Sequence, residues 1–308
     1  MQFNEYLKSC RESIDLTQDQ LSHALYTFDN ESFVSIDSNT LSKWERNIIK
    51  PHISKQVLLI KYFQQQTHTA LPCFTDYSVA ETEALICKAG MTNLLGNSKE
   101  LVLNFPSDTM RADDLLVYAL RHSENLEKIL DINLGLDKDF NHDASGFQTG
   151  QFKEWALHPS SSFFACEYQG QFFGLLFTLR LKPEVFERMM NLEIDEKDLS
   201  IEDFASFDEM GSNHMISFFA MNEKAASMLF IRYYAHLIAN QSVIKEVGLA
   251  TMMNDTRKFI SNMNLHYHTS KMLGEGLELQ TYRETLDNFL ASEKVIKMLL
   301  SKQTCPEE

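Results

Sequence analysis

The sequence has little glycine and proline, with 11 glycines and 6 prolines among 308 residues. Usual shares are about 7% and 5%, and β-sandwiches or barrels depend on turns built from these residues. The shortage therefore disfavours such folds and favours long helices. Apolar residues make up 44% of the chain, which excludes a wholly disordered protein. We expect an α+β protein, and the length is typical of two domains.

Long apolar runs are also missing, and no apolar stretch follows a basic start at the N-terminus. We therefore expect no signal peptide, no membrane span and a cytoplasmic location. The five cysteines contain no CxxC pair, which argues against a disulfide framework or a thiolate zinc site. We expect buried or unreactive thiols.

Positive charge is scarce, with 28 Lys and Arg against 43 Asp and Glu and a net charge of −15. Such a balance normally counts against a nucleic-acid binder. The charge is unevenly distributed along the chain. Residues 1–66 carry seven cations and eight acids, whereas the remaining residues have a net charge of −14. A small, nearly neutral domain is therefore expected at 1–66. A linker and connecting helix should cover 67–98, and an acidic domain 99–308.

Helical periodicity dominates the first 95 residues. Thr17 is a typical N-cap, and Asn47 tolerates the left-handed position that ends a helix. The expected elements are a helix over 3–14, a helix at Gln18–Leu25, an irregular stretch at Tyr26–Ile36, a helix from Ser38 toward Asn47, a helix at His52–Gln66, a connector at Thr67–Ser78 and a helix at Val79–Leu95.

The third expected helix has the two faces that DNA reading requires. Leu41 and Trp44 form an apolar face for docking, and the other face is polar. Asn39 suits adenine and Lys43 suits guanine, each pairing worth about 1–3 kcal/mol of discrimination. The candidate base-facing residues are Ser38, Asn39, Ser42 and Lys43, and the candidate phosphate contacts are Gln18, Thr40, Arg46 and Lys50.

These residues resemble the lambda-repressor-like (XRE) helix-turn-helix family over residues 1–66. The resemblance lies in Leu16-Thr17-Gln18 and in Thr40 to Asn47, followed by Lys50-Pro51. It implies double-stranded DNA as partner and an ion pair between Glu45 and Arg11. The turn departs from the family, since 17 positions separate Ala24 from Leu41 where about ten are usual. We therefore expect an insertion at Phe28–Ser35.

Strands and helices alternate after Gly96, which predicts a mixed sheet. The expected elements are a strand at Leu101–Phe105, a helix at Arg111–Leu136 broken near Ser123, a hairpin of Phe163–Tyr168 and Phe172–Leu181, a strand at Met215–Ala220, a helix at Lys224–Ala239, a strand at Ile244–Thr251, a helix at Asp255–Met263, strands at Leu265–Thr269 and Leu277–Thr285, and a helix ending near Ser301.

This order resembles the GNAT acyltransferase superfamily over about residues 99–308, with the best local match at Asn254–Tyr267. The resemblance implies a glycine-containing loop for the coenzyme A pyrophosphate, but the matching segment, 220–226, has no glycine and carries Glu223. Ile260 aligns with the usual proton-donating tyrosine and has no proton to give. Acyl-CoA is therefore disfavoured, and no catalytic residue is assigned. A shifted alignment would instead make Tyr267 or Tyr282 the acid.

Four other patterns have ordinary structural explanations. His266 and His268 share a strand face, but no third metal ligand follows, and no metal is expected. Cys87 and Cys166 lack nearby histidines. The acidic run Glu193–Asp208 lacks the spacing of a calcium loop. The last group is the apolar stripe of the final helix, which fits a core or an oligomer face: Leu286, Phe289, Leu290, Ile296, Leu299 and Leu300.

Two functions of different classes remain open. The first is a sequence-specific transcriptional regulator, dimeric on DNA, whose acidic domain senses a small-molecule ligand or mediates assembly. Dimer contacts would come from Val79–Leu95 or the last helix. The second is an N-acyltransferase that uses acyl-CoA and carries a DNA-binding module. A non-catalytic partner-binding protein, such as an antitoxin, is a third.

Overall fold

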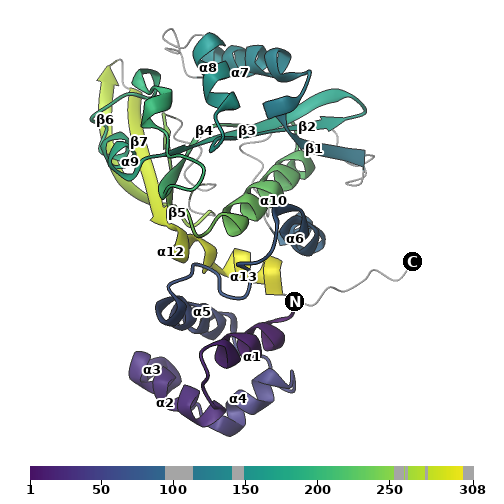
Figure 1. Ribbon diagram of the computed structural model, residues 1–308, viewed down its shortest axis with the longest axis vertical. Coiled ribbons are helices and arrows are strands. Elements are labelled where there is room, and N and C mark those ends of the chain that lie inside the picture. Colours follow the sequence, from purple (N-terminus) through teal and green to yellow (C-terminus); the bar gives the residue numbers. More distant parts are fainter. Residues whose placement is uncertain (94–113, 141–148, 253–259, 261–262, 275–276, 301–308) are drawn as a thin grey trace. The chain divides into compact units, whose positions relative to one another are not determined.

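The computed structural model describes residues 1–93, 114–140, 149–252, 260, 263–274 and 277–300 (Figure 1). The chain divides into two compact units. The helical unit comprises Met1–Leu94, Ala235–Gln241 and Asp287–Glu308. The sheet unit comprises Leu95–Tyr234 and Ser242–Leu286. The expected α+β class is confirmed, with helices first and a mixed sheet after them. None of the described helices is long and apolar enough to cross a membrane.

Local signals set the helix boundaries of the helical unit. Thr17 caps the second helix, where its side chain accepts the N–H of Gln20. Asn47 has a φ of 57°, as expected of a residue that ends a helix. The helices are α1 (Phe3–Ser13), α2 (Gln18–Phe28), α3 (Asn30–Phe33), α4 (Ser38–Glu45), α5 (Ile53–Thr67), α6 (Val79–Asn93), α12 (Leu286–Leu290) and α13 (Glu293–Leu300).

The stretch expected to be irregular is more ordered than predicted. Helix α2 continues to Phe28, and α3 follows at once with Asp29 as its cap. Phe33 is fully buried, and Lys55 on α5 donates to the carbonyl of Ser32. The expectation of an irregular Tyr26–Ile36 was wrong, because burial of one aromatic residue stabilises a helical turn that periodicity does not reveal.

The last helix of the described chain is part of the core of the helical unit. It packs against α5 and α6, and Ile296, Leu299 and Leu300 are buried. The core explanation of this stripe therefore holds for these residues.

The sheet has seven strands in the order β1-β2-β3-β4-β5-β7-β6. Among the described strands, only β4 and β5 run parallel to each other. The described elements follow the order of strands and helices on which the GNAT resemblance rested. The strands are β1 (Leu115–Ala119), β2 (Ser162–Tyr168), β3 (Gln171–Leu181), β4 (Gly211–Ala220), β5 (Ile244–Thr251), β6 (His266–Gly274) and β7 (Leu277–Thr285).

One expected helix proved to contain a strand. Residues Leu115–Ala119 form β1, which pairs antiparallel with β2, and the helix α7 begins only at Leu126 and ends at Phe140. The helix predicted over Arg111–Leu136 was therefore wrong in its first half, because a short apolar run fits either period and only strand pairing decides. The strand predicted at Leu101–Phe105 and nearly all of the helix predicted at Asp255–Met263 lie outside the described residues.

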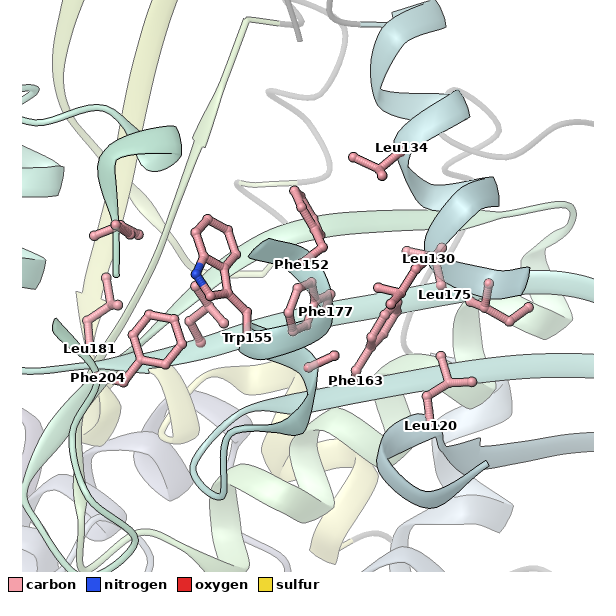
Figure 2. Packing of buried hydrophobic residues seen from close by; sticks show 14 of the residues in the cluster. Leu120, Leu130, Leu134, Phe152, Trp155, Phe163, Leu175, Phe177, Leu181 and Phe204 are labelled. Atoms are coloured by element: carbon pink, nitrogen blue, oxygen red, sulfur yellow. The ribbon is translucent and has the colours of Figure 1, made fainter. Parts of the chain in front are cut away.

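Helices cover both faces of the sheet. Helices α7 and α8 (Thr149–Leu157) lie on one face and α10 (Glu223–Ala239) on the other (Figure 1). Trp155, Phe152 and Phe177 form the centre of the first layer, where the Phe152 and Trp155 rings are 5.2 Å apart (Figure 2). In the second layer, the ring centroids of Phe230 on α10 and Phe218 on β4 are 4.7 Å apart. A short helix, α9 (Pro183–Met190), completes the first layer.

Candidate functional site

Helix α4 begins at a tightly bonded cap. Asp37 Oδ1 accepts the N–H of Thr40 at 2.7 Å and its hydroxyl at 2.6 Å. These hydrogen bonds, led by the hydroxyl, lower the pKa of the Asp37 carboxyl. Asp37 thus satisfies helix-terminal groups that would otherwise need water.

The inner face of α4 is buried against α1 and α2. Leu41 is fully buried and Trp44 is 5% exposed, so the apolar face expected from the sequence is confirmed. Glu45 is also buried, although it carries a charge. A buried carboxylate needs paired charge and hydrogen bonds to be tolerated.

Arg11 on α1 supplies that charge. Its Nε donates to Glu45 Oε1 at 2.6 Å, and its Nη2 lies 3.1 Å from Glu45 Oε2. A third bond joins Arg11 Nη1 to the carbonyl of Leu16 at 2.7 Å. The hydrogen bond to Glu45 is the main cause that raises the pKa of Arg11. The ion pair implied by the family resemblance is confirmed, and it joins α4 to α1 and to the start of α2.

The eight candidate DNA-contacting residues lie on or beside α4, except for Gln18 at the start of α2. Gln18 Nε2 donates to Glu45 Oε2 at 2.7 Å, so this side chain belongs to the buried network. The Thr40 hydroxyl is used in the cap, and Arg46 Nε donates to the Ser42 carbonyl at 3.2 Å. Three of the eight candidates are exposed: Asn39, Arg46 and Lys50. The other five are half-buried: Gln18, Ser38, Thr40, Ser42 and Lys43.

Sequence reasoning missed two apolar neighbours of this surface. Ile48 is 60% exposed and Ile49 is 50% exposed, directly after α4. Their position next to a helix-ending Asn47, with no helical period to bury them, is the signal that could have found them.

The sheet unit has a second candidate site where β4 and β5 part. The parallel pairing ends at Met215 and Leu249, after which β4 continues along β3 and β5 along β7. One residue before this point lies His214, whose Nε2 is 2.6 Å from Glu196 Oε1. The His214 side chain is fully buried, and its Nδ1 has no hydrogen-bond partner within the described part of the chain. A buried ring nitrogen without a partner is rare and suits a ligand or a water.

The start of α10 does not fit a pyrophosphate well. Asn222 Oδ1 accepts the N–H of Ala225 at 2.9 Å, so one amide that would face a phosphate is already used. Glu223 places a carboxylate in the first turn. The positive end of the helix is thus partly neutralised before any ligand arrives.

The positions suggested for a proton donor differ in availability. Ile260 is buried and aliphatic. Tyr282 is buried and its hydroxyl donates to Gln280 Oε1 at 2.6 Å. Tyr267 is 58% exposed and donates to Ser270 Oγ at 3.1 Å.

The histidines of β6 each have a protein partner. His266 Nδ1 lies 2.7 Å from Glu284 Oε2, and His268 Nε2 lies 2.9 Å from Asn191 Oδ1. Within the described ranges, no three His, Cys, Asp or Glu side chains gather as metal ligands would.

No protein-family model and no curated protein matches the chain. Solved structures do. An N-acyl amino acid synthase from uncultured soil microbes, FeeM, is 10% identical with a TM-score of 0.40, over 57% of this chain and 92% of that one. A probable acetyltransferase from Staphylococcus epidermidis is 10% identical with a TM-score of 0.35, over 56% and 98%. A GNAT-family acetyltransferase from Streptococcus pneumoniae is 10% identical with a TM-score of 0.36, over 56% and 99%. At these values, function has to be argued from the residues of this chain.

Proposed function

We propose that the helical unit binds double-stranded DNA through α4 and that the chain is a sequence-specific transcriptional regulator. The observation that carries this proposal is the buried network of Arg11, Glu45 and Gln18 behind α4. A recognition helix must keep one orientation in the major groove, and charge-assisted bonds to two other helices hold it there.

The outer side of α4 has the chemistry for the two kinds of contact. Asn39 is exposed at the start of the helix, and Lys43 lies one turn later. An amide pairs with adenine and an ammonium with guanine, whereas Arg46 and Lys50 would contact phosphates without reading sequence. One short helix covers few base pairs, so we propose a homodimer on two half-sites about 34 Å apart.

Selection of sites from random duplex DNA by the full chain tests the proposal. Asn39→Ala and Lys43→Ala should relax preference at single positions, by about 1–3 kcal/mol each. Lys50→Ala should weaken binding to all sequences alike, and it should reduce the slope of log binding constant against log salt concentration by about 0.9. Lys245→Ala, which removes an exposed cation of the sheet unit, is the matched control and should change nothing.

Failure to enrich any sequence would refute DNA reading by α4. If Asn39→Ala and Lys43→Ala left the enriched sequences unchanged, a surface other than α4 would have to contact the bases. Sedimentation as a monomer both with and without the selected duplex would refute the dimer.

In this proposal the sheet unit senses a ligand or mediates assembly. The poor fit of α10 to a pyrophosphate and the lack of a proton donor at Ile260 support that role over turnover of acyl-CoA. The unpartnered Nδ1 of His214, beside the parting of β4 and β5, is where we propose that a small ligand binds.

N-acyl transfer is the second candidate, and the pair of His214 with Glu196 favours it. The Glu196 carboxylate on Nε2 orients the ring and favours the tautomer that carries its proton on Nε2, which leaves Nδ1 as the atom that accepts a proton from an attacking amine. Release of thiol from acetyl-CoA in the presence of amines, together with calorimetric titration, tests this. Turnover that His214→Gln abolishes and His158→Gln leaves intact would establish the enzyme. No heat and no thiol release would exclude acetyl-CoA as the ligand.

A further inference from the structure

Two cysteines distant in sequence touch in the helical unit. Cys10 lies on the buried face of α1, and Cys73 lies in the connector after α5. Their sulfur atoms are 3.3 Å apart, although 63 positions separate the residues. A disulfide needs about 2.05 Å, so formation of the bond requires a movement of about 1.3 Å.

The fold holds Cys73 in place against α1. Its φ of 68° lies in the left-handed region that side chains with a Cβ rarely adopt. The next residue, Phe74, is fully buried, and its ring lies 6.2 Å from that of Tyr6, one turn before Cys10. A strained backbone fixed by a buried neighbour is a reason to look for function.

The two thiols are unequal in reactivity. Burial is the main cause that raises the pKa of Cys10 well above its ordinary value. The hydrogen bond with Cys10 outweighs burial at Cys73 and lowers the pKa of the Cys73 thiol. Cys73 is also the more accessible, since it is half-buried and Cys10 is fully buried. Thiolates are the nucleophiles in cysteine chemistry, so Cys73 reacts first.

We propose that Cys10 and Cys73 form a reversible disulfide when hydrogen peroxide oxidises Cys73. The Cys73 thiolate attacks one peroxide oxygen, the O–O bond breaks, and a sulfenic acid and hydroxide result. The Cys10 sulfur then attacks the Cys73 sulfur. The S–S bond forms as the S–O bond breaks, and water leaves with the Cys10 proton. The cysteine pair loses two electrons, and the peroxide gains them.

Oxidation of the full chain with hydrogen peroxide, followed by mass spectrometry without reduction, tests the proposal. The intact mass should fall by two hydrogen atoms and return after dithiothreitol. Trypsin alone leaves Cys73 and Cys87 in one peptide, so Glu-C is added to cut between them at Glu81 and Glu83. The expected product is a peptide pair joined through Cys10 and Cys73.

Three variants assign the order of steps. Cys73→Ala should yield no linked pair. Cys10→Ala should leave a sulfenic acid on Cys73 that dimedone traps. Cys166→Ala is the matched control, because burial raises the pKa of that thiol to about 12, and linkage should proceed as before.

The wild-type peptide map does not depend on how the variants fold. A pair joined through any other cysteines, or a linkage between two chains, would overturn the proposal. Conversion of Cys73 to sulfinic acid without linkage would overturn it as well.

Discussion

Replacement of Glu45 by glutamine tests whether the buried ion pair holds α4 in place. The change keeps the shape of the side chain and removes its charge. Arg11 is then left 12% exposed with no buried counter-charge, and Gln18 loses a carboxylate acceptor. Glu45→Gln therefore removes one partner of a desolvated pair and leaves the other in place.

The expected loss follows from the cost of breaking a buried pair. Removal of one partner typically costs about 3–5 kcal/mol. The glutamine oxygen still accepts one bond from Arg11, so we expect about 3 kcal/mol here. With a urea slope of about 1.5 kcal/mol/M, the unfolding midpoint of the helical unit should fall by about 2 M.

Tryptophan fluorescence can follow this unit alone. The chain has two tryptophans, with Trp44 in the helical unit and Trp155 in the sheet unit. In a Trp155→Phe background, the urea curve of the full chain reports on Trp44. Glu12→Gln is the matched control, since Glu12 lies 3.4 Å from Arg11 but is 54% exposed. We expect the control to cost less than about 1 kcal/mol.

Equal midpoints for Glu45→Gln and Glu12→Gln would refute the reasoning. The carboxylate would then contribute no more than a surface charge, and the orientation of α4 would rest on apolar packing alone.

Four further outcomes are expected. Trp44→Ala should cost about 3–5 kcal/mol and remove the cooperative unfolding of the helical unit, as followed by circular dichroism. Gly174→Ala should cost about 1–3 kcal/mol, because the added Cβ would lie 2.6 Å from a backbone oxygen of β4. A Cβ added at Gly135 would meet no atom within 4 Å, so Gly135→Ala should instead raise the free energy of unfolding by up to about 1 kcal/mol, as measured by Trp155 fluorescence during thermal melting. The lowered pKa of Asp37 means that its cap stabilises α4 above the unfolded-state pKa and loses this effect as pH falls through the folded-state pKa. Asp37→Asn should therefore flatten the dependence of the unfolding free energy on pH below about pH 4. If this dependence were the same in the variant and the wild type, the cap from Asp37 to Thr40 would be contradicted.

Local chemistry was sufficient for much of the secondary structure. The cap at Thr17, the left-handed Asn47 and the hairpin of Phe163–Tyr168 with Phe172–Leu181 depend on residues close together in the chain, and all are confirmed. The bounds expected for Ile244–Thr251 match β5. Such features depend on propensities that a short segment carries by itself.

The sequence alone also determined the composition, the uneven charge and the polar face of α4, because these depend only on which residues occur and in what order. Tertiary structure decided the rest. Pairing with β2 made Leu115–Ala119 a strand, since the same apolar run satisfies either period until a neighbour supplies hydrogen bonds. The contacts of His214 with Glu196 and of Cys10 with Cys73 join separate segments, and nothing in the sequence of either segment predicts its partner. Only the closure of the chain around its cores brings such groups within bonding distance, and burial then changes their chemistry.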